Sequence, residues 1–204
     1  MSDAVLGAVL AGGASRRMGQ DKAALTLDGT PLSHRVQRAL FDGGVGAVVL
    51  VGGDQGAEGA IPDRWPGEGP LAALATAVGH GASVEGVAIV IVAACDQPDL
   101  PADLVAALVH ALAAGPADAC ASAVRTPDGR VHPFPSAWRT AGADALVALV
   151  DAGERRADAA FTIGPLIEVG ADATALDDLD TPDDVRRWLE RHHGTELQPP
   201  GHRA

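Results

Sequence analysis

The segment Val87–Ala94 (VAIVIVAA) constrains the fold more than any other part of the chain. It is apolar at every position and lacks the alternation of a strand that faces water on one side, so it predicts a strand buried on both faces. Other apolar segments alternate along the chain with helical patterns, which is typical of βαβ units. We therefore predict an α/β fold with a mainly parallel sheet, centred on Val87–Ala94, and helices on both faces.

The same patterns place the other elements. The expected strands are Ala4–Leu10, Ala47–Val51, Ala117–Val124 and Leu166–Val169, and the expected helices are Pro31–Phe41, Pro70–His80, Pro101–Ala114, Ala141–Asp151 and Pro182–Arg191. A turn signal at Thr126–Gly129 (TPDG) between the extended segments Ala121–Arg125 and Arg130–Trp138 predicts a small antiparallel excursion. Thr181 is a suitable N-cap for the last helix. We expect residues 1–192 to form a single domain and the polar residues 193–204 to form a disordered tail.

The first expected strand runs directly into the glycine-rich loop, Leu10–Lys22 (LAGGASRRMGQDK). Backbone N–H groups of small residues can approach phosphate oxygens closely. The small residues here are Ala11, Gly12, Gly13, Ala14 and Ser15. Arg16, Arg17 and Lys22 add positive charge, and the loop matches neither the Walker A pattern nor the GxGxxG pattern of dinucleotide-binding folds. We interpret the loop as a cradle for a nucleoside triphosphate; the alternative is a solvated basic loop.

The charge of the chain limits its partners. A net charge of -12 disfavours nucleic acid and acidic membranes over long range, so an anionic ligand needs a local basic pocket. Lys22 is the only lysine among fifteen basic residues, and it lies in the glycine-rich loop. No apolar run approaches the roughly 20 residues of a membrane span, and the N-terminus lacks the basic region of a signal peptide. We expect a cytoplasmic protein.

Asp96 directly follows the expected central strand, at the carboxyl end where open α/β sheets bind ligands. Mg²⁺ prefers octahedral oxygen ligands and takes one or two carboxylates from a protein, with water and phosphate oxygens completing the shell. Asp96 is therefore a candidate metal ligand; the alternative is a helix N-cap before Pro98 and Pro101. Asp96 and Asp99 do not have the spacing of the DxD pair that is typical of glycosyltransferases.

Together these segments resemble one enzyme family. The sequence LAGGASRRMGQDKAAL is similar to the signature of molybdenum cofactor guanylyltransferases, the MobA-type enzymes of the nucleotidyltransferase superfamily. Further similar segments are Asp63 with Gly69–Leu71 (GPL), Cys95–Pro98 (CDQP), Val131–Pro133 (VHP), Gly153–Arg156 (GERR) and Asp178–Val185 (DLDTPDDV). The resemblance covers nearly the whole chain.

The resemblance implies a Rossmann-like three-layer nucleotidyltransferase fold, similar to the glycosyltransferase-A fold. It implies transfer of GMP from GTP to the terminal phosphate of molybdopterin, with Mg²⁺ as cofactor and pyrophosphate as the second product. A phosphate nucleophile is already ionised, so the reaction needs no general base. Proteins of molybdoenzyme maturation are possible further partners.

The resemblance also assigns roles to residues of this chain. The implied catalytic residues are Arg16, Lys22 and Asp96, and the implied metal ligands are Asp96 and Asp180. The implied nucleotide contacts are Leu10, Ala11, Gly12, Gly13, Lys22, Asp63, Gly69, Leu71 and Asp96. The candidates for the second substrate are His132, Arg155 and Arg156.

Each of the weaker assignments has an alternative. Asp180 can equally lie in a solvated turn before the last helix. Arg155 and Arg156 can be surface charges that flank a helix, and His132 can be an ordinary loop histidine.

The nucleotide base is less constrained than the chemistry. The Asp63 carboxylate can accept hydrogen bonds from N1–H and N2–H of guanine. The resembled family often has an asparagine after the second strand, however, and this chain contains no asparagine and has Gly52 there. A molybdopterin cytidylyltransferase or a sugar-phosphate nucleotidyltransferase is therefore an alternative. An alternative from another class is an inactive nucleotide-binding partner or chaperone in cofactor delivery.

Overall fold

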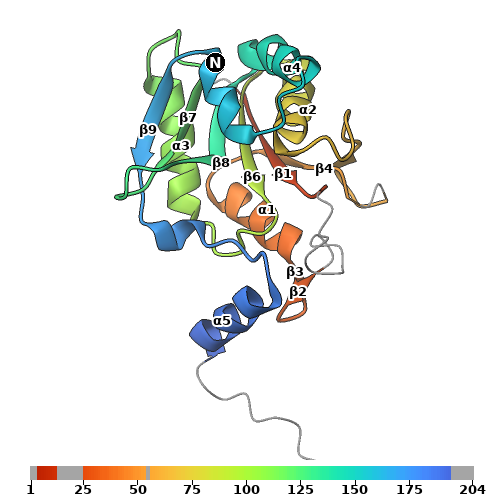
Figure 1. The fold of residues 1–204 in the computed structure, drawn as a ribbon, viewed down its shortest axis with the longest axis vertical. Coiled ribbons are helices and arrows are strands. Elements are labelled where there is room, and N and C mark those ends of the chain that lie inside the picture. The colour runs from red at the N-terminus through yellow and green to blue at the C-terminus, as the bar shows by residue number, and fades with distance from the viewer. Residues whose placement is uncertain (1–3, 13–24, 54–55, 194–204) are drawn as a thin grey trace, which may run out of the picture.

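A mixed seven-stranded sheet forms the centre of the computed structural model, which describes residues 4–12, 25–53 and 56–193 (Figure 1). The strand order is β5-β4-β1-β6-β8-β7-β9, and β6 (Val87–Ala94) is the middle strand, as predicted. It pairs in parallel with β1 (Ala4–Leu10), which pairs in parallel with β4 (Ala47–Val51). Strand β8 (Val131–Arg139) runs antiparallel to both β6 and β7 (Ala121–Arg125). The predicted mainly parallel sheet with an antiparallel excursion is confirmed.

The remaining elements surround this sheet. The other strands are β2 (Thr26–Leu27), β3 (Thr30–Pro31), β5 (Ala60–Ile61) and β9 (Leu166–Gly170). The α-helices are α1 (Leu32–Asp42), α2 (Pro70–Ser83), α3 (Ala102–Ala114), α4 (Ala143–Asp151) and α5 (Pro182–His193), and the 3₁₀ helices are η2 (Thr140–Gly142), η3 (Ala157–Ile163) and η4 (Ala173–Leu176).

Four predicted boundaries were wrong by two residues or more. Two are the ends of α2 and α5, which lie at Ser83 and His193 rather than at His80 and Arg191; the other two are starts. The strand expected from Ala117 begins at Ala121, because the preceding residues form a turn in which the Ala119 N–H donates to the Pro116 carbonyl (3.0 Å). The helix expected from Ala141 begins as a single 3₁₀ turn, and its α-helical part starts at Ala143.

Side chains of β6 alternate between two buried clusters, which places helices on both faces of the sheet. Val90 and Val92 pack with residues of α2 and α4, whereas Ile89 and Ile91 pack with residues of α1 and α3. Burying such a side chain fully stabilises the fold by about 1.5–3 kcal/mol. The result is the predicted three-layer arrangement, with the apolar run of β6 at its centre (Figure 1).

Helix α5 packs against a third, smaller cluster outside these layers. We call this the α5 cluster; its fully buried members are Leu27, Leu32, Leu179 and Trp188. Figure 1 shows α5 beside the β2–β3 hairpin, away from the main sheet. The predicted tail lies outside the described residues except for His193, which ends α5. Among the described helices, none has the length and apolar character to cross a membrane.

Candidate functional site

The carboxyl ends of β1, β4 and β6 meet at one edge of the sheet. The Cys95 N–H, just beyond β6, donates to the Leu10 carbonyl (3.2 Å). On the other side of β1, the N–H groups of Ala11 and Gly12 both donate to the Val51 carbonyl (2.9 and 3.1 Å). The start of the glycine-rich loop is therefore held between the residues that follow β6 and those that follow β4.

Glycines allow this close approach. Gly52 has φ +75°, and a Cβ placed on it would lie 2.8 Å from Gly12 Cα and 3.0 Å from Gly12 N. Asparagine is among the few other residues that adopt this left-handed conformation, but the Gly12 backbone fills the space that its Cβ would need. The packing of the two backbones explains why glycine stands at this position.

The rest of the glycine-rich loop, with Gly13, Arg16 and Lys22, lies outside the described residues. The roles that the resemblance implies for these three residues stay predictions. Leu10, Ala11 and Gly12 are described and lie at the carboxyl end of the sheet. Their contacts with a nucleotide also stay predictions.

Asp63 lies next to this edge, where two donors orient its carboxylate. Its Oδ1 accepts hydrogen bonds from the Trp65 N–H (3.0 Å) and from the Thr76 hydroxyl (2.9 Å). The Thr76 oxygen accepts in turn from the Arg64 N–H (3.1 Å). The Asp63 Cβ is 4.0 Å from the position that a Gly52 Cβ would occupy, so Asp63 faces the β4 side of the site.

Thr76 is a site residue that the sequence analysis missed. It lies in α2 within the apolar run LAALATAV and is only 9% exposed. A polar side chain at a position that helical packing buries requires a partner. A buried threonine within an apolar helix could therefore have indicated a polar contact from the sequence alone. The sequence does not show that the partner is Asp63, 13 residues away.

The N-terminus of α2 meets the GERR segment. The Leu71 N–H donates to the Arg155 carbonyl (3.3 Å), and a Cβ at Gly69, which has φ +97°, would lie 3.1 Å from the same oxygen. The Leu71 side chain is fully buried. Leu71 can therefore shape a base pocket only through packing, because its N–H already has a partner.

Both arginines of the GERR segment are engaged with protein groups. Arg155 pairs with Glu68 (Nε to Oε2, 2.6 Å) and donates from Nη1 to the Val150 carbonyl (2.9 Å), so it ties the loop before α2 to the end of α4. Arg156 is exposed and pairs with Asp158, and this pairing holds the pKa of the Asp158 carboxyl below its ordinary value. An anionic second substrate would have to compete with these carboxylates.

His132 lies in β8 near the residues that follow β6. The Gln97 side-chain amide donates to the Phe134 carbonyl (3.3 Å), which brings this part of β8 against the CDQP segment. His132 Nε2 is 3.1 Å from the Thr126 hydroxyl. Burial, and then the nearby charge of Arg130, lower the His132 pKa from its ordinary value of 6.5. At neutral pH the ring is therefore mainly uncharged, and it offers a hydrogen bond rather than a positive charge.

The two predicted metal ligands come from segments that touch. The Leu179 N–H donates to the Asp96 carbonyl (2.9 Å), and Asp180 follows directly. Helix α3 has Pro101 as its N-cap residue and no side-chain cap, which excludes the alternative that Asp96 caps this helix. The Asp180 N–H donates to Asp184 Oδ2 (3.2 Å).

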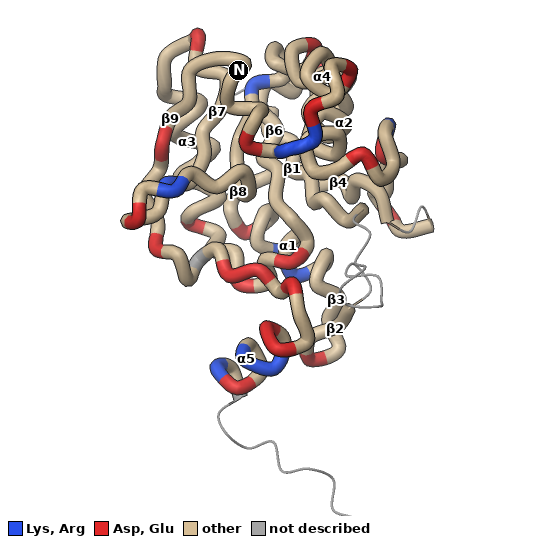
Figure 2. Tube along the Cα trace, in the orientation of Figure 1, with Lys and Arg blue, Asp and Glu red and all other residues tan. Residues whose placement is uncertain are grey.

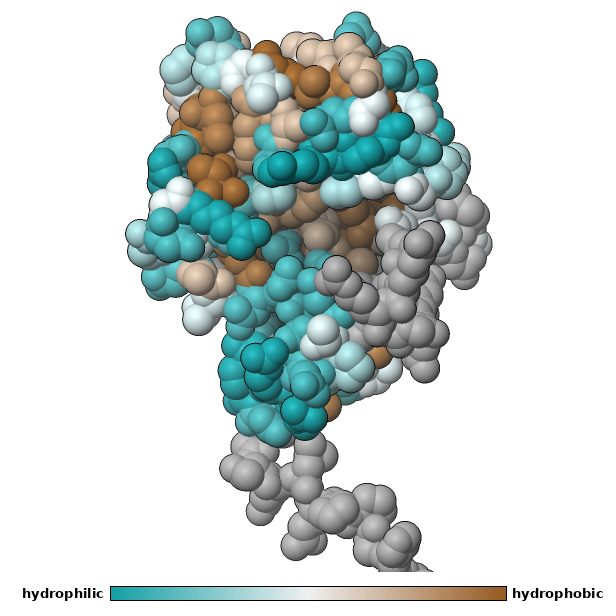
Figure 3. All heavy atoms as spheres, viewed as in Figure 1, coloured by the Kyte–Doolittle hydropathy of each residue, from teal (hydrophilic) through white to brown (hydrophobic). Residues whose placement is uncertain are grey.

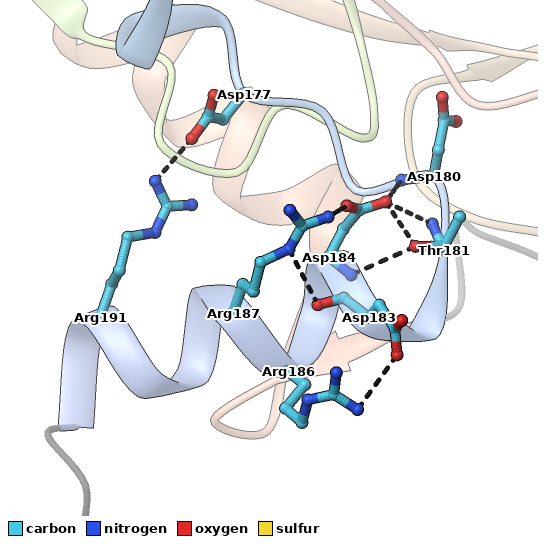
Figure 4. Close-up of polar contacts among 8 residues, drawn as sticks. All are labelled: Asp177, Asp180, Thr181, Asp183, Asp184, Arg186, Arg187 and Arg191. Atoms are coloured by element: carbon cyan, nitrogen blue, oxygen red, sulfur yellow. Dashed lines mark hydrogen bonds and ion pairs between the residues drawn. The ribbon is translucent and has the colours of Figure 1, made fainter.

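The start of α5 is a reciprocal capping arrangement. The Thr181 hydroxyl accepts from the Asp184 N–H (3.2 Å), and Asp184 Oδ2 accepts from the Thr181 N–H (2.7 Å). The Thr181 hydroxyl also donates to the same carboxylate and is the main cause of its lowered pKa. Figure 4 shows that the Asp180 carboxylate points away from this network. Thr181 thus caps α5 as predicted, and Asp180 is directed elsewhere.

The donor set suits a metal ion that binds together with phosphates. In the part of the chain that the structure describes, no group of three or more His, Cys, Asp or Glu side chains could hold a metal by itself. Mg²⁺ takes one or two carboxylates and completes its shell with water and phosphate oxygens, so Asp96 and Asp180 fit it. Figure 2 shows acidic residues along the segment that leads into α5, and Figure 3 shows that this face is hollowed between the main body and the part that carries α5.

Comparison with known proteins shows which family the chain matches. Residues 7–164 match the family model of the MobA-like NTP transferase domain. Proteins named molybdenum cofactor guanylyltransferase are 33% identical in Rhizobium johnstonii (91% of this chain, 93% of the relative) and 36% identical in Rhodobacter capsulatus (92% and 96%).

Solved structures share the fold at lower identity. Molybdopterin-guanine dinucleotide biosynthesis protein A from Archaeoglobus fulgidus superposes with a TM-score of 0.74 at 22% identity (91% of this chain, 97% of that chain). A Mycobacterium tuberculosis protein, solved as a complex with manganese, gives a TM-score of 0.63 at 18% identity (92% and 98%).

Proposed function

This chain belongs to the family of MobA-like NTP transferase domains and is a nucleotidyltransferase, and from that premise we propose that it transfers GMP from GTP to the terminal phosphate of molybdopterin. The products are a guanine dinucleotide cofactor and pyrophosphate. The two relatives described above, matched over 93% and 96% of their own length, are named molybdenum cofactor guanylyltransferase.

One structural observation supports the proposal above all others. Three segments far apart in the sequence meet at the carboxyl edge of the sheet: the start of the glycine-rich loop, Asp96, and the segment of Asp180. The bonds that join them run from the Cys95 N–H to the Leu10 carbonyl and from the Leu179 N–H to the Asp96 carbonyl. A phosphate cradle next to two carboxylates is the arrangement that a metal-bound triphosphate requires.

The proposed chemistry relies on positioning and charge. A terminal phosphate of molybdopterin attacks the α-phosphorus of GTP; the new P–O bond forms as the bond to the β-phosphate oxygen breaks, and the electron pair leaves with pyrophosphate. Arg16 and Lys22 of the glycine-rich loop stabilise the negative charge that develops on the leaving group. Because the attacking oxygen is already ionised, no residue is required to remove a proton.

Asp96 and Asp180 are the residues that would hold the divalent metal, proposed as Mg²⁺. When bound, the ion neutralises phosphate charge and orients the triphosphate. Both carboxylates are hard oxygen ligands, as Mg²⁺ prefers, and the solved neighbour with manganese supports a divalent ion in this fold.

We propose that the guanine base binds on the β4 side of the site. The Asp63 carboxylate, held by Thr76, would accept from N1–H and N2–H of guanine. The Gly69–Leu71 backbone would form the wall of the base pocket, with the buried Leu71 side chain packed behind it. His132 is proposed to meet molybdopterin through a hydrogen bond. Arg155 and Arg156 can do so only if their carboxylate partners are displaced.

Three further proposals concern the domain organisation, the location of the reaction and the recipients of its product. We propose that residues 1–192 act as one domain with 193–204 as an appended tail, a division that limited proteolysis can check. The reaction is placed in the cytoplasm. Proteins of molybdoenzyme maturation are the proposed recipients of the product.

The test is pyrophosphate release from GTP and molybdopterin with Mg²⁺, together with detection of the dinucleotide. CTP and UTP as donors, and a hexose 1-phosphate as acceptor, separate the guanylyltransferase from related nucleotidyltransferases. We expect Asp96→Ala and Lys22→Ala to lower turnover by about 10²-fold or more while the circular dichroism spectrum is retained. The matched control is Asp118→Ala, which makes the same change at an exposed carboxylate in the turn before β7. Binding of Mg-GTP without pyrophosphate release would instead favour a silent nucleotide-binding partner.

A further inference from the structure

Two hydrogen bonds join the loop after β6 to the chain around α5: the bond from Leu179, just before the helix, to Asp96, and a second bond from the helix itself. The Trp188 Nε1–H donates to Asp99 Oδ2 (2.7 Å), three residues beyond Asp96. We propose that the Trp188–Asp99 hydrogen bond is a positioning contact, which holds the segment of Asp180 against that of Asp96 and thereby sets the affinity of the site for the divalent metal. This inference rests on the proposed function, which makes the two carboxylates the metal ligands.

The indole of Trp188 is held on several sides. It is 1% exposed within the α5 cluster, and its ring stacks on His192 with centroids 3.9 Å apart. The guanidinium of Arg35 lies 4.9 Å from the ring centroid and donates to the Leu27 carbonyl (3.2 Å). Because the ring is packed in this way, its N–H direction is defined, and the bond to Asp99 fixes α5 relative to the loop after β6.

Other contacts of α5 are weaker constraints. A cavity of about 510 Å³ lies between residues 177–179 and the helix, where it is lined by Asp184, Arg187, Glu190 and Arg191. The ion pair between Arg191 and Asp177 spans this region, but both side chains are more than 40% exposed. Exposed pairs contribute little to holding two elements together. The position of α5 therefore depends mainly on its buried contacts.

A shift of α5 is transmitted to Asp180. The Asp180 and Thr181 N–H groups both donate to Asp184 Oδ2 in the first turn of the helix (3.2 and 2.7 Å). Figure 4 shows Asp180 at the end of this network, with its carboxylate directed away from α5. The carboxylate therefore moves with the helix, whereas Asp96 moves with the sheet.

A metal site responds strongly to such a displacement. Mg²⁺ requires nearly ideal octahedral geometry with metal–oxygen distances of about 2.0–2.1 Å. Loss of groups that orient metal ligands commonly weakens metal affinity by about 10–100-fold. The Trp188–Asp99 bond acts through a helix, so we expect the lower end of that range, about 10-fold.

The test compares two tryptophans. Trp188→Phe keeps an aromatic ring for stacking and removes the N–H. The matched control is Trp138→Phe, which removes an equally buried indole N–H that donates to Ser136 Oγ (2.8 Å) on β8, away from the site. The measurements are the half-saturating Mg²⁺ concentration for pyrophosphate release, Mn²⁺ binding in the presence of GTP by electron paramagnetic resonance without molybdopterin, the KM for molybdopterin and the melting temperature.

We expect both variants to melt at lower temperature, but only Trp188→Phe to need about 10-fold more Mg²⁺ and to bind Mn²⁺ correspondingly less tightly. Its KM for molybdopterin should stay unchanged. Asp99→Ala removes the Trp188–Asp99 bond and also the contact between Asp99 Oδ1 and His192 Nε2 (3.4 Å). It should show at least the same metal defect, and the double variant should be no worse than Asp99→Ala, because that variant already lacks the Trp188 bond. If Trp188→Phe does not fold, Asp99→Ala, whose side chain is partly exposed, carries the comparison.

Two failures can be distinguished. A wild-type chain that neither binds Mn²⁺ with GTP nor releases pyrophosphate overturns the proposed function and this inference together. A wild-type chain that does both, with Trp188→Phe and Asp99→Ala matching the Trp138→Phe control in metal dependence, overturns the positioning role alone.

Discussion

The hydroxyl of Thr76 offers the sharpest test of base recognition. Thr76→Val keeps the shape of the side chain but removes the acceptor for the Arg64 N–H (3.1 Å) and the hydroxyl hydrogen that Asp63 Oδ1 (2.9 Å) shares with the Ala72 carbonyl (3.0 Å). A hydrogen bond to a charged group contributes about 1.5–3 kcal/mol and a neutral one about 0.5–1.5 kcal/mol. Asp63 is only half-buried, so we expect a total loss near the low end, about 2 kcal/mol, or a melting temperature lower by roughly 4–8 °C.

The catalytic effect should be selective. Without the Thr76 hydroxyl, Asp63 loses one of the two donors that orient it toward the base. We expect the KM for GTP to rise about 10-fold, equivalent to about 1.4 kcal/mol, with kcat nearly unchanged because ground state and transition state lose the same contact. Steady-state kinetics with varied GTP at saturating molybdopterin measure both constants.

The control for this variant is Thr140→Val, which makes the same chemical change at the opposite end of β6. The Thr140 hydroxyl is 3.1 Å from the Val87 carbonyl. This variant should lose stability and keep the wild-type KM for GTP. If Thr76→Val shows the expected drop in melting temperature but a wild-type KM, Asp63 does not contact the base and the reasoning is refuted.

Three further predictions follow from the described contacts. Gly52→Ala should destabilise the protein by at least about 1–2 kcal/mol, because alanine is unfavourable in the left-handed conformation and its Cβ would also clash with the Gly12 backbone. The variant should also lower GTP affinity. Urea unfolding measures the first effect and GTP titration the second. Asp184 has a pKa below its ordinary 3.8, so its contribution to stability is present above that pH and is lost as the pH falls through the folded-state value; Asp184→Asn should therefore show a smaller loss of melting temperature on acidification than wild type. Arg155→Ala should lower stability through loss of the Glu68 pair and the carbonyl contacts, and an unchanged KM for molybdopterin would assign this arginine to structure rather than to the substrate.

Local sequence patterns predicted those parts of the fold that depend on burial within a single strand or on a single turn. The run Val87–Ala94 predicted the central strand because a strand without polar positions has no face for water. The turn at Thr126–Gly129 predicted the antiparallel hairpin. The boundary predicted at Ala117 was wrong because a turn, closed by the bond from the Ala119 N–H to the Pro116 carbonyl, precedes the strand. The next residue, Cys120, is then held by the carbonyl of Pro165, a distant residue that local sequence does not specify.

By itself, the sequence determined the type of chemistry: a loop of small and basic residues after the first strand, a carboxylate after the central strand, and a second acidic segment before the last helix. Only the tertiary structure decided which side chains around the site are paired with other protein groups. It joined Trp188 to Asp99, 89 residues apart, and it occupied Arg155 with Glu68, 87 residues away. The physical reason is that a residue's type specifies what it can bind, whereas its partner is set by which distant segments the packed sheet and helices bring within hydrogen-bonding distance.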